Sequence, residues 1–372
     1  MSFLEDTINV IGFLILTVGF IIRNTIRSLI PEKYKAKNIC GDIALITGGG
    51  GVLGRLIALR LAKLGVIVVV WDVNKAGAGT PAEVYDWAAK FYALISRKLS
   101  IEETVNLVKS SGGICYGYVC DLCNREDIYR KAAQVKKEVG KVAILINNAG
   151  LGSCYKFLNT SDKLIIQTME VNVLSHFWTT KAFLPSMMEH NYGHIVSIAS
   201  MAGYIGVPHM INYCTSKFAA VGFEEALHME LVAEGYKINS TVVCPFFIQS
   251  TGMFNKVSTR YLPRLTPNNV ADRVVSAIRC NEKIVIVPGY FYILLILKLV
   301  VPWESAGMFL RGMFLNQIHS SNTSSKEEEE EEKEKEKEKG EEIIPTVFSK
   351  DLDTTVIQQQ LTRLFSSSER KP

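Results

Sequence analysis

The feature that most constrains the fold is a glycine-rich turn between an apolar strand and a helix. Residues 42–47 (DIALIT) predict a buried strand, and five of the next seven residues are glycine. Residues 55–65 then predict a helix, and residues 66–71 (VIVVVW) predict a second strand that ends at Asp72. Glycines let a backbone approach a pyrophosphate, and the N-terminus of the helix offers free N–H groups. The pattern therefore predicts a dinucleotide-binding unit.

The acidic residue at the end of the second strand bears on the choice of dinucleotide. Asp72 would accept hydrogen bonds from the hydroxyls of the adenosine ribose. Its carboxylate would repel a 2′-phosphate group at the same place. We therefore expect NAD as the preferred cofactor, with NADP as the other possibility.

The rest of the chain continues the alternation of strand and helix. Further buried strands are predicted at residues 115–121, 142–146, 194–199 and 238–244, with helices between them. This order predicts an α/β fold with a doubly wound parallel sheet, the Rossmann fold, in a single domain. Asp121 ends one of these strands, and the sequence Asn147-Asn148-Ala149-Gly150 ends the next. Because ligands bind at the carboxyl ends of parallel strands, these residues are expected to line a cofactor cleft.

A tyrosine and a lysine provide the predicted chemistry. Tyr213 lies four residues before Lys217 in a predicted helix, so both side chains share one face. A free phenol has a pKa of about 10, and a nearby ammonium group favours the phenolate. Ser200 ends the preceding strand and could donate a hydrogen bond to a substrate oxygen. The alternatives are an ordinary amphipathic helix and a serine that only caps the strand end.

The N-terminal segment predicts a membrane anchor. Residues 7–22 carry no charge, the residues before them are acidic, and the flank after them is basic. A signal peptide has a basic start and a cleavage site, and neither is present. The positive-inside rule then places the rest of the chain in the cytosol. The run is slightly short for a span, so spanning and monotopic insertion both remain open. A buried helix is the remaining alternative.

Composition and residue bias limit the other classes. The chain has 372 residues and a net charge of +4, which does not indicate nucleic-acid binding. Its 8 cysteines are scattered, so we predict neither a disulfide framework nor a metal site. Residues 284–303 predict a last strand followed by a lipid-facing or pocket-lining helix, and 326–342 is a solvated Glu/Lys run. The predicted division is 1–37 for the anchor and basic flank, 38–300 for the Rossmann domain, and 301–372 for the tail.

Together these motifs resemble the short-chain dehydrogenase/reductase family. The resemblance covers about residues 38–300 and adds Asn172 to the set. It implies that Tyr213 takes the alcohol proton, that Lys217 lowers the tyrosine pKa, that Ser200 holds the substrate oxygen, and that Asn172 supports a proton-returning water chain. The implied cofactor-binding residues are Thr47, Gly48, Gly50, Gly51, Gly54, Asp72, Asp121, Asn148, Ala149, Gly150, Tyr213, Lys217 and Thr251. A homodimer is expected by analogy.

Several stretches resemble one membrane-anchored branch of that family, the retinol and 17-beta-hydroxysteroid dehydrogenases. They include HFWTTKAFLP, GHIVSIAS and YCTSKFAAVGF. The resemblance implies oxidation of a lipophilic alcohol, such as retinol or a hydroxysteroid, at the endoplasmic reticulum membrane or a lipid droplet. The partners implied are the lipophilic substrate and the membrane or droplet surface.

Three departures from the family pattern leave other interpretations open. Val52 replaces the middle glycine of the turn, where its side chain could crowd a pyrophosphate. Residues 76–100 form an insertion, and the segment 245–251 is one residue longer than usual, so Ser250 or Thr251 could meet the cofactor. The alternatives are an NADP-dependent reductase of long-chain ketones or aldehydes and a catalytically silent scaffold of the same fold.

Overall fold

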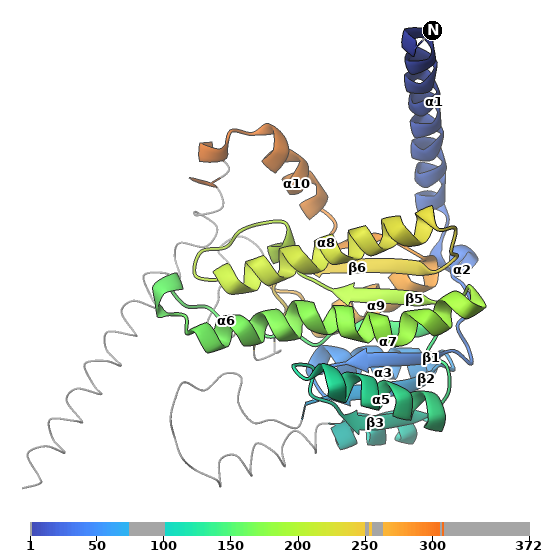
Figure 1. Ribbon diagram of the computed structural model, residues 1–372, viewed down its shortest axis with the longest axis vertical. Helices are drawn as coiled ribbons and strands as arrows, with labels where there is room; N and C mark the ends of the chain where they lie inside the picture. Colours follow the sequence, from blue (N-terminus) through green and yellow to red (C-terminus); the bar gives the residue numbers. More distant parts are fainter. Residues whose placement is uncertain (1, 74–100, 250–252, 255–262, 306, 309–372) are drawn as a thin grey trace, which may run out of the picture. The chain divides into compact units, whose positions relative to one another are not determined.

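Seven parallel strands form one sheet in the computed structural model (Figure 1), in the order β3-β2-β1-β4-β5-β6-β7. The structure describes residues 2–73, 101–249, 253–254, 263–305 and 307–308, without the side chains of 2–11, 24, 27 and 28. The strand order reverses between β1 and β4, and this switch point is where doubly wound sheets bind ligands. The predicted fold class is confirmed. The strands are β1 (Ile43–Thr47), β2 (Ile67–Asp72), β3 (Cys115–Val119), β4 (Ile144–Asn147), β5 (His194–Ile198), β6 (Asn239–Pro245) and β7 (Ile284–Val287).

Helices cover both faces of the sheet (Figure 1). One face packs against α3 (Val52–Lys63), α9 (Pro267–Cys280) and the helical residues 101–110. The other face packs against α5 (Arg125–Glu138), α7 (Ser175–His190) and α8 (Ile211–Ala233). Strands buried on both faces read as continuous apolar runs, which explains the DIALIT and VIVVVW sequences.

Local chemistry sets several of the helix starts. The Asn124 side chain accepts a hydrogen bond from the backbone of Asp127 at the start of α5. Thr266 caps α9 in the same way, and Pro267 occupies its first turn. These caps satisfy N–H groups that have no partner within the helix.

The helix before α7 changes its winding at a functional residue. α6 (Asp162–Met169) continues into a π-helical turn (Glu170–Leu174), which leads directly into α7. Asn172 lies at the centre of that turn and is fully buried. π-turns are rare and are found mostly at functional sites.

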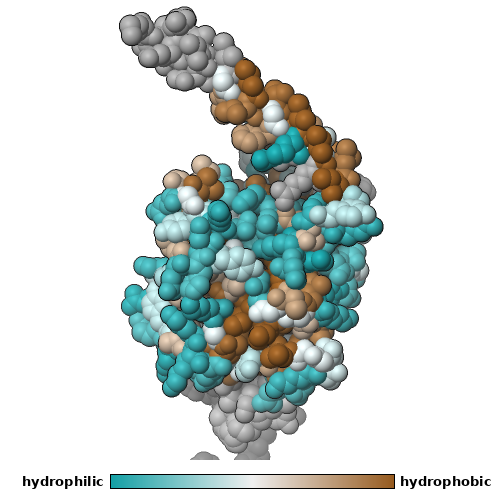
Figure 2. All heavy atoms as spheres, turned by 90° about the vertical axis from the view of Figure 1, so that its right-hand side faces the viewer, coloured by the Kyte–Doolittle hydropathy of each residue, from teal (hydrophilic) through white to brown (hydrophobic). Residues whose placement is uncertain are grey.

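The N-terminal segment is helical. α1 spans Ser2–Leu29, and the short α2 (Glu32–Lys35) follows it. Figure 2 shows hydrophobic side chains along the coloured part of α1. Within the residues that the structure describes, no helix is long and apolar enough to cross a membrane.

The C-terminal part of the domain follows the prediction for residues 284–303. β7 is followed by α10 (Phe291–Val300), which is apolar except for Lys298. All described residues belong to one compact unit, Met1–Asn316. The insertion at 76–100, Ser250, Thr251 and the Glu/Lys run lie outside the described residues, and the domain boundaries remain predictions.

Candidate active site

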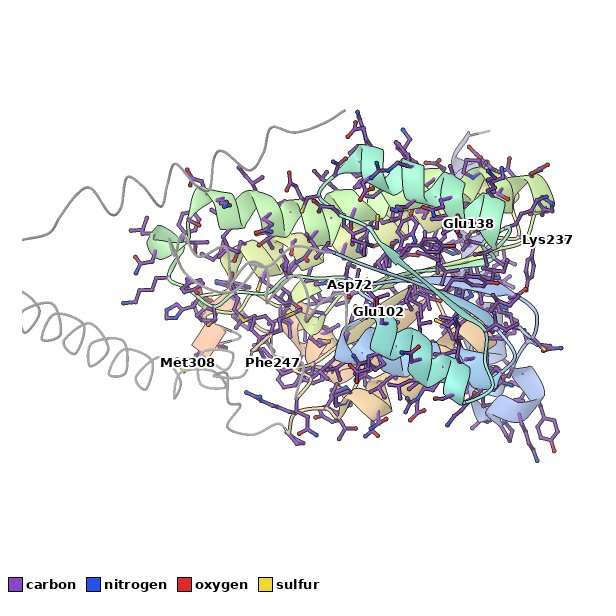
Figure 3. All side chains as sticks on the ribbon, turned by 90° about the horizontal axis from the view of Figure 1, so that it is seen from below. Asp72, Glu102, Glu138, Lys237, Phe247 and Met308 are labelled. Carbon is purple, nitrogen blue, oxygen red and sulfur yellow. The ribbon has the colours of Figure 1, made fainter. Side chains whose placement is uncertain are left out.

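A cavity of about 1030 Å³ lies along the carboxyl edge of the sheet. Its lining residues lie in the order of the strands. Asp72 is the last residue of β2, whereas Gly48, Gly150, Ser200 and Phe246 come after β1, β4, β5 and β6. Figure 3 shows Phe247 on the side of the domain away from Glu138 and Lys237, with Asp72 between them. The cavity is therefore polar on the β2 side and apolar on the β6 side.

The glycine turn brings the backbone close to the end of β4. Gly48 has a φ of +65°, and a Cβ there would lie 2.9 Å from the Cα of Ala149. A Cβ at Gly54 would lie 2.9 Å from the Cα of Gly49 and 3.0 Å from Nδ2 of Asn148. No real side chain fits at such distances, so Gly48 and Gly54 are required by packing.

Val52 takes the first position of α3 rather than a place within the turn. Gly51 caps this helix without a side-chain hydrogen bond. Val52 is 40% exposed and lines the cavity, as Gly51 and Gly54 do. Its backbone N–H is therefore part of the helix N-terminus that the sequence predicts for binding a pyrophosphate.

Thr47 and Asn148 tie the ends of β1 and β4 together. The Thr47 hydroxyl accepts hydrogen bonds from the backbone N–H groups of Asn148 (3.0 Å) and Ala149 (3.1 Å). The Asn148 amide donates in return to the carbonyls of Thr47 (2.9 Å) and Gly48 (3.2 Å). Asn148 thus joins the ends of these two neighbouring strands.

Asp72 is held by the backbone on both of its oxygens. It accepts hydrogen bonds from the N–H of Gly50 (3.0 Å) and of Val73 (2.8 Å), and it lines the cavity. Asp121 also lines the cavity and accepts from the N–H of Cys123 (3.1 Å). Each carboxylate oxygen has two lone pairs, so both acids can still accept hydrogen bonds from a ligand.

Two residues that the sequence did not single out support the glycine turn from behind. Arg55 donates to the carbonyl of Gly50 (3.2 Å) and to the hydroxyl of Thr104 (3.1 Å). Thr104 is fully buried and donates to the carbonyl of Gly49 (3.0 Å). Thr104 lies in the helix 101–110, far along the chain, so no local pattern could have identified it.

Ser200, Tyr213 and Lys217 meet at the middle of the cavity. The Ser200 hydroxyl caps the short helix Met201–Gly203 by accepting from the N–H of Ala202 (3.1 Å), and it also hydrogen-bonds the phenol of Tyr213. The Lys217 ammonium lies 5.7 Å from the centre of the Tyr213 ring and donates to the carbonyl of Ile198 (2.9 Å). The predicted trio is therefore brought together, and both the capping and the substrate-holding interpretations of Ser200 fit.

Burial determines the pKa of the tyrosine. It raises the pKa of Tyr213 to about 12, although the hydrogen bond with Ser200 acts in the other direction. Burial also lowers the pKa of Lys217 to about 8, and the Lys217 ammonium donates to a backbone carbonyl. The lowering of the Tyr213 pKa by Lys217, expected from the sequence, stays a prediction.

Asn172 is occupied by its neighbours. Its Oδ1 accepts from the N–H of Leu151 (2.7 Å), and its Nδ2 donates to the carbonyl of Leu151 (2.8 Å) and to the hydroxyl of Ser216 (2.9 Å). Asn172 thus fixes the segment after Gly150 against the helix that carries Lys217. It does not line the cavity among the described residues.

The apolar part of the cavity is built from residues that the sequence analysis did not identify. Phe254 packs edge-to-face on Tyr213 with 5.1 Å between ring centres. Phe246 packs against Phe291 at the start of α10. No short motif joins these residues, which come from four separate segments. The main contributors are Met201, Ile205, Met210, Phe246, Phe247, Met253, Phe254 and Phe291.

The polar part of the cavity fits a nicotinamide dinucleotide. The backbone at Gly48 and Gly54 approaches too closely for any Cβ, and Asp72 stands at the end of the neighbouring strand. Gly48, Gly51, Gly54, Asp72, Asp121, Asn148, Ala149 and Gly150 line this part, Thr47 braces it, and Gly50 bonds to Asp72. No group of three or more His, Cys, Asp or Glu able to hold a metal occurs within the described ranges.

Known proteins are similar to this chain over most of its length. A bovine protein, short-chain dehydrogenase/reductase family 16C member 6, is 44% identical over 73% of this chain and 80% of its own. Estradiol 17-beta-dehydrogenase 11 of Rattus norvegicus is 42% identical, covering 81% of this chain and 92% of its own. Human epidermal retinol dehydrogenase 2 is 39% identical, and the match covers 82% of this chain and 92% of its own.

Solved structures and a family model agree with this result. A short chain dehydrogenase/reductase from Burkholderia phymatum in complex with NAD has a TM-score of 0.59 at 23% identity, covering 70% of this chain and 94% of its own. A metagenomic short-chain oxidoreductase in complex with NADP has a TM-score of 0.52 at 22% identity, covering 67% and 96%. These two likenesses show the fold alone. The model for short chain dehydrogenase matches residues 77–262. The chain therefore belongs to the short-chain dehydrogenase/reductase family, as an oxidoreductase of the retinol and hydroxysteroid dehydrogenase branch.

Proposed function

We propose that this protein oxidises a lipophilic alcohol with NAD, most favourably retinol or a 17-beta-hydroxysteroid. One observation carries the proposal: Ser200, Tyr213 and Lys217 stand where the polar and apolar parts of one cavity meet. A substrate with a long apolar body and one hydroxyl would place that hydroxyl beside Tyr213 and its body among the phenylalanines. The names of the relatives from rat and human support these two substrate classes.

A bound nicotinamide would supply the acceptor for the hydride. Ser200 orients the substrate oxygen, and Tyr213 takes the hydroxyl proton. Because burial raises the pKa of Tyr213 to about 12, the phenol is protonated at neutral pH and suits the donation of a proton to a carbonyl. Oxidation of the alcohol requires the phenolate, so its rate should rise with pH. Lys217 lies close enough to stabilise the phenolate when its own amine is charged.

NAD rather than NADP is supported by the carboxylate of Asp72. Two backbone N–H groups hold this carboxylate at the cavity wall. A 2′-phosphate placed there would meet a negative charge. Arg55, in the first turn of α3, is engaged with Glu103 (2.8 Å) and with the carbonyl of Gly50.

Attachment to a membrane or lipid-droplet surface is part of the proposal. In α1 the apolar side chains of Phe13, Ile15 and Leu16 are 67%, 67% and 61% exposed. In α10 Ile293, Ile296 and Leu299 are also exposed, while Phe291 is fully buried at the cavity. Apolar faces of this kind favour insertion at a lipid interface. We place the protein at the endoplasmic reticulum membrane or a lipid droplet, with the catalytic domain facing the cytosol.

A homodimer is also proposed. Phe177 on α7 and Phe218 on α8 expose 42% and 44% of their surface on the long helices that the family resemblance assigns to subunit contact. Size-exclusion chromatography with light scattering on detergent-solubilised protein would give the mass of the assembly. A monomeric mass at micromolar concentration would exclude this part of the proposal.

The test of the function uses full-length protein in membranes. Reduction of NAD⁺ and NADP⁺ is measured with all-trans-retinol and with estradiol, and Tyr213→Phe is the matched control. We expect NAD⁺ reduction with at least one alcohol and a loss of about 10²–10⁴-fold in Tyr213→Phe. Preference for NADPH and long-chain ketones would support the reductase alternative. Cofactor binding with no turnover of any alcohol or carbonyl would favour the silent scaffold.

A further inference from the structure

A second buried polar cluster lies directly behind Lys217. Glu224 is on α8, seven residues and about two helical turns after Lys217, and it is only 2% exposed. Ser197 on β5 donates to Oε2 of Glu224, and Ser197 Oγ lies 3.3 Å from Nδ1 of His176 on α7. His176 and Ser197 are also buried. Three hydrogen-bonding side chains on three different elements thus form a continuous chain.

The two catalytic helices carry matching rows of polar residues. On α8, Tyr213, Lys217 and Glu224 share one face. On the opposite helix, His176 follows Asn172 by four residues. Lys217 donates to the carbonyl of Ile198, the residue next to Ser197. The His176–Ser197–Glu224 cluster is therefore the next layer behind the site, and the charge of Lys217 acts on His176.

At one end of the cluster, Nε2 of His176 is fully buried and has no partner among the described residues. At the other end, Ser240 and the backbone of Thr241 hydrogen-bond to the Glu224 carboxylate, as Ser197 does. Buried polar atoms without partners are rare and call for an explanation. A glutamine at position 224 would make the same structural hydrogen bonds without burying an acid. Burial of an ionisable side chain costs folding free energy, and a purely structural role does not require that cost.

The cluster has two hydrogen-bonded states that differ by one proton. With Glu224 ionised, His176 donates from Nδ1 to Ser197, and Ser197 donates to the carboxylate. With Glu224 protonated, the carboxyl donates to Ser197, Ser197 donates to Nδ1, and the His176 proton sits on Nε2. Conversion of the first state into the second adds one proton at Nε2 of His176. The Nδ1 proton then passes to Ser197, and the Ser197 proton passes to Glu224. The net result is one additional proton on the Glu224 carboxylate.

We propose that His176, Ser197 and Glu224 form a buried proton store that exchanges protons with the Lys217 side of the active site. The proposal rests on the proposed function only for the source of the proton, which alcohol oxidation releases at Tyr213. The Glu224 end faces the exposed Lys283, whose positive charge favours the ionised carboxylate and so favours release of the stored proton. Lys283 itself lies 3.4 Å from Nδ1 of His228.

The electrostatic surroundings favour storage near neutral pH. Burial raises the pKa of Glu224 to about 8, against the opposing effects of hydrogen bonds from Ser197 and Ser240. Burial lowers the pKa of His176 to about 3, so the imidazole stays neutral and relays a proton without holding a charge. The titratable and polar groups that face the cluster are Lys217 on α8, Ser240 and Thr241 on β6, and Lys283 before β7.

Infrared spectroscopy of the full-length protein tests the store without any substrate. We expect the C=O band of a buried carboxylic acid that disappears as the pH rises through about 8. The band should be absent in Glu224→Gln and present in Glu225→Gln, a matched control at the next, exposed position of α8. Absence of a titrating band from the wild type, or its persistence in Glu224→Gln, would overturn the proposal.

Nitrogen NMR of histidine-labelled protein tests the exchange with His176 and Lys217. The His176 proton should move from Nδ1 to Nε2 as the pH falls through the Glu224 midpoint, and Ser197→Ala should abolish that movement while keeping the infrared band. Lys217→Met should raise the midpoint by on the order of half a pH unit, because a nearby cation opposes proton uptake. A pH-independent His176 tautomer, or a midpoint unaffected by Lys217→Met, would contradict the proposal. Failure to oxidise any alcohol would count against the proposed function alone.

Discussion

The two halves of the cavity are built in different ways. The cofactor half consists of backbone and short polar side chains at the ends of β1, β2 and β4, fixed by hydrogen bonds such as those between Thr47 and Asn148. The substrate half consists of large apolar side chains after β5, β6 and β7, fixed only by packing, as between Phe254 and Tyr213. The first half tolerates almost no added atom, whereas the second can repack. Changes in the two halves should therefore affect different measured quantities.

The largest effect is expected from a methyl group in the cofactor half. In Gly54→Ala the new Cβ would collide with the backbone of Gly48 and Gly49, and neither segment can move without breaking the link to Asn148. We expect the Kd for NAD⁺ to rise by about 100-fold or more, measured by quenching of intrinsic fluorescence. Gly222→Ala is the control, because a Cβ there meets nothing within 4 Å. Similar Kd values in both variants would show that this half is as adaptable as the other.

The next effect concerns the stability of the same half. Thr47→Ala removes the acceptor for two N–H groups at the end of β4, and the residue is 2% exposed. We expect the free energy of unfolding to fall by about 2–3 kcal/mol, because each unpaired buried N–H costs about 1–3 kcal/mol. Thr47→Ser keeps the hydroxyl and should lose less than half as much. Chemical denaturation in detergent measures both, and equal losses would mean that the methyl group rather than the hydroxyl matters.

A smaller effect is expected from the substrate half. Phe254→Ala removes a ring that packs against Tyr213 and against Phe247. The ring centres of Phe254 and Phe247 are 5.7 Å apart. We expect the KM for the lipophilic alcohol to rise about 10-fold, as for the loss of one apolar contact, while the Kd for NAD⁺ stays the same. Phe254→Leu should retain most of the affinity. A change in the Kd for NAD⁺ would show that the two halves are not independent.

The same difference explains what the sequence could predict. Gly48, Gly54, Asp72 and Asn148 were found because consecutive parallel strands bring their ends to one edge, so short local motifs suffice. Phe246 was not predicted, because its contact with Phe291 depends on packing between separate segments. For Phe291 the sequence predicted only a helix that faces lipid or lines a pocket, within residues 284–303.

Two features of the site depend on solvent exclusion and are equally hidden from the sequence. One is the pKa of Tyr213, which burial raises to about 12. The other is the burial of Glu224. In the sequence alone, this glutamate could equally well lie on the exposed face of an amphipathic helix. Spacing along a helix predicts which side chains share a face, but the dielectric around them is set by elements from elsewhere in the chain.

The smallest effect should distinguish charge from shape within the cofactor half. Asp72→Asn keeps the size of the side chain and removes its charge, although one of its two backbone hydrogen bonds is lost. We expect the Kd for NADP⁺ to fall and the Kd for NAD⁺ to rise, each by several-fold, because removing a like charge near a phosphate is worth about 1 kcal/mol in partly solvated surroundings. Asp121→Asn makes the same change at the end of β3 and should affect both dinucleotides equally. If Asp72→Asn left the ratio of the two Kd values unchanged, the carboxylate would serve only to hold Gly50 and Val73, and the preference for NAD would have to come from the shape of the turn.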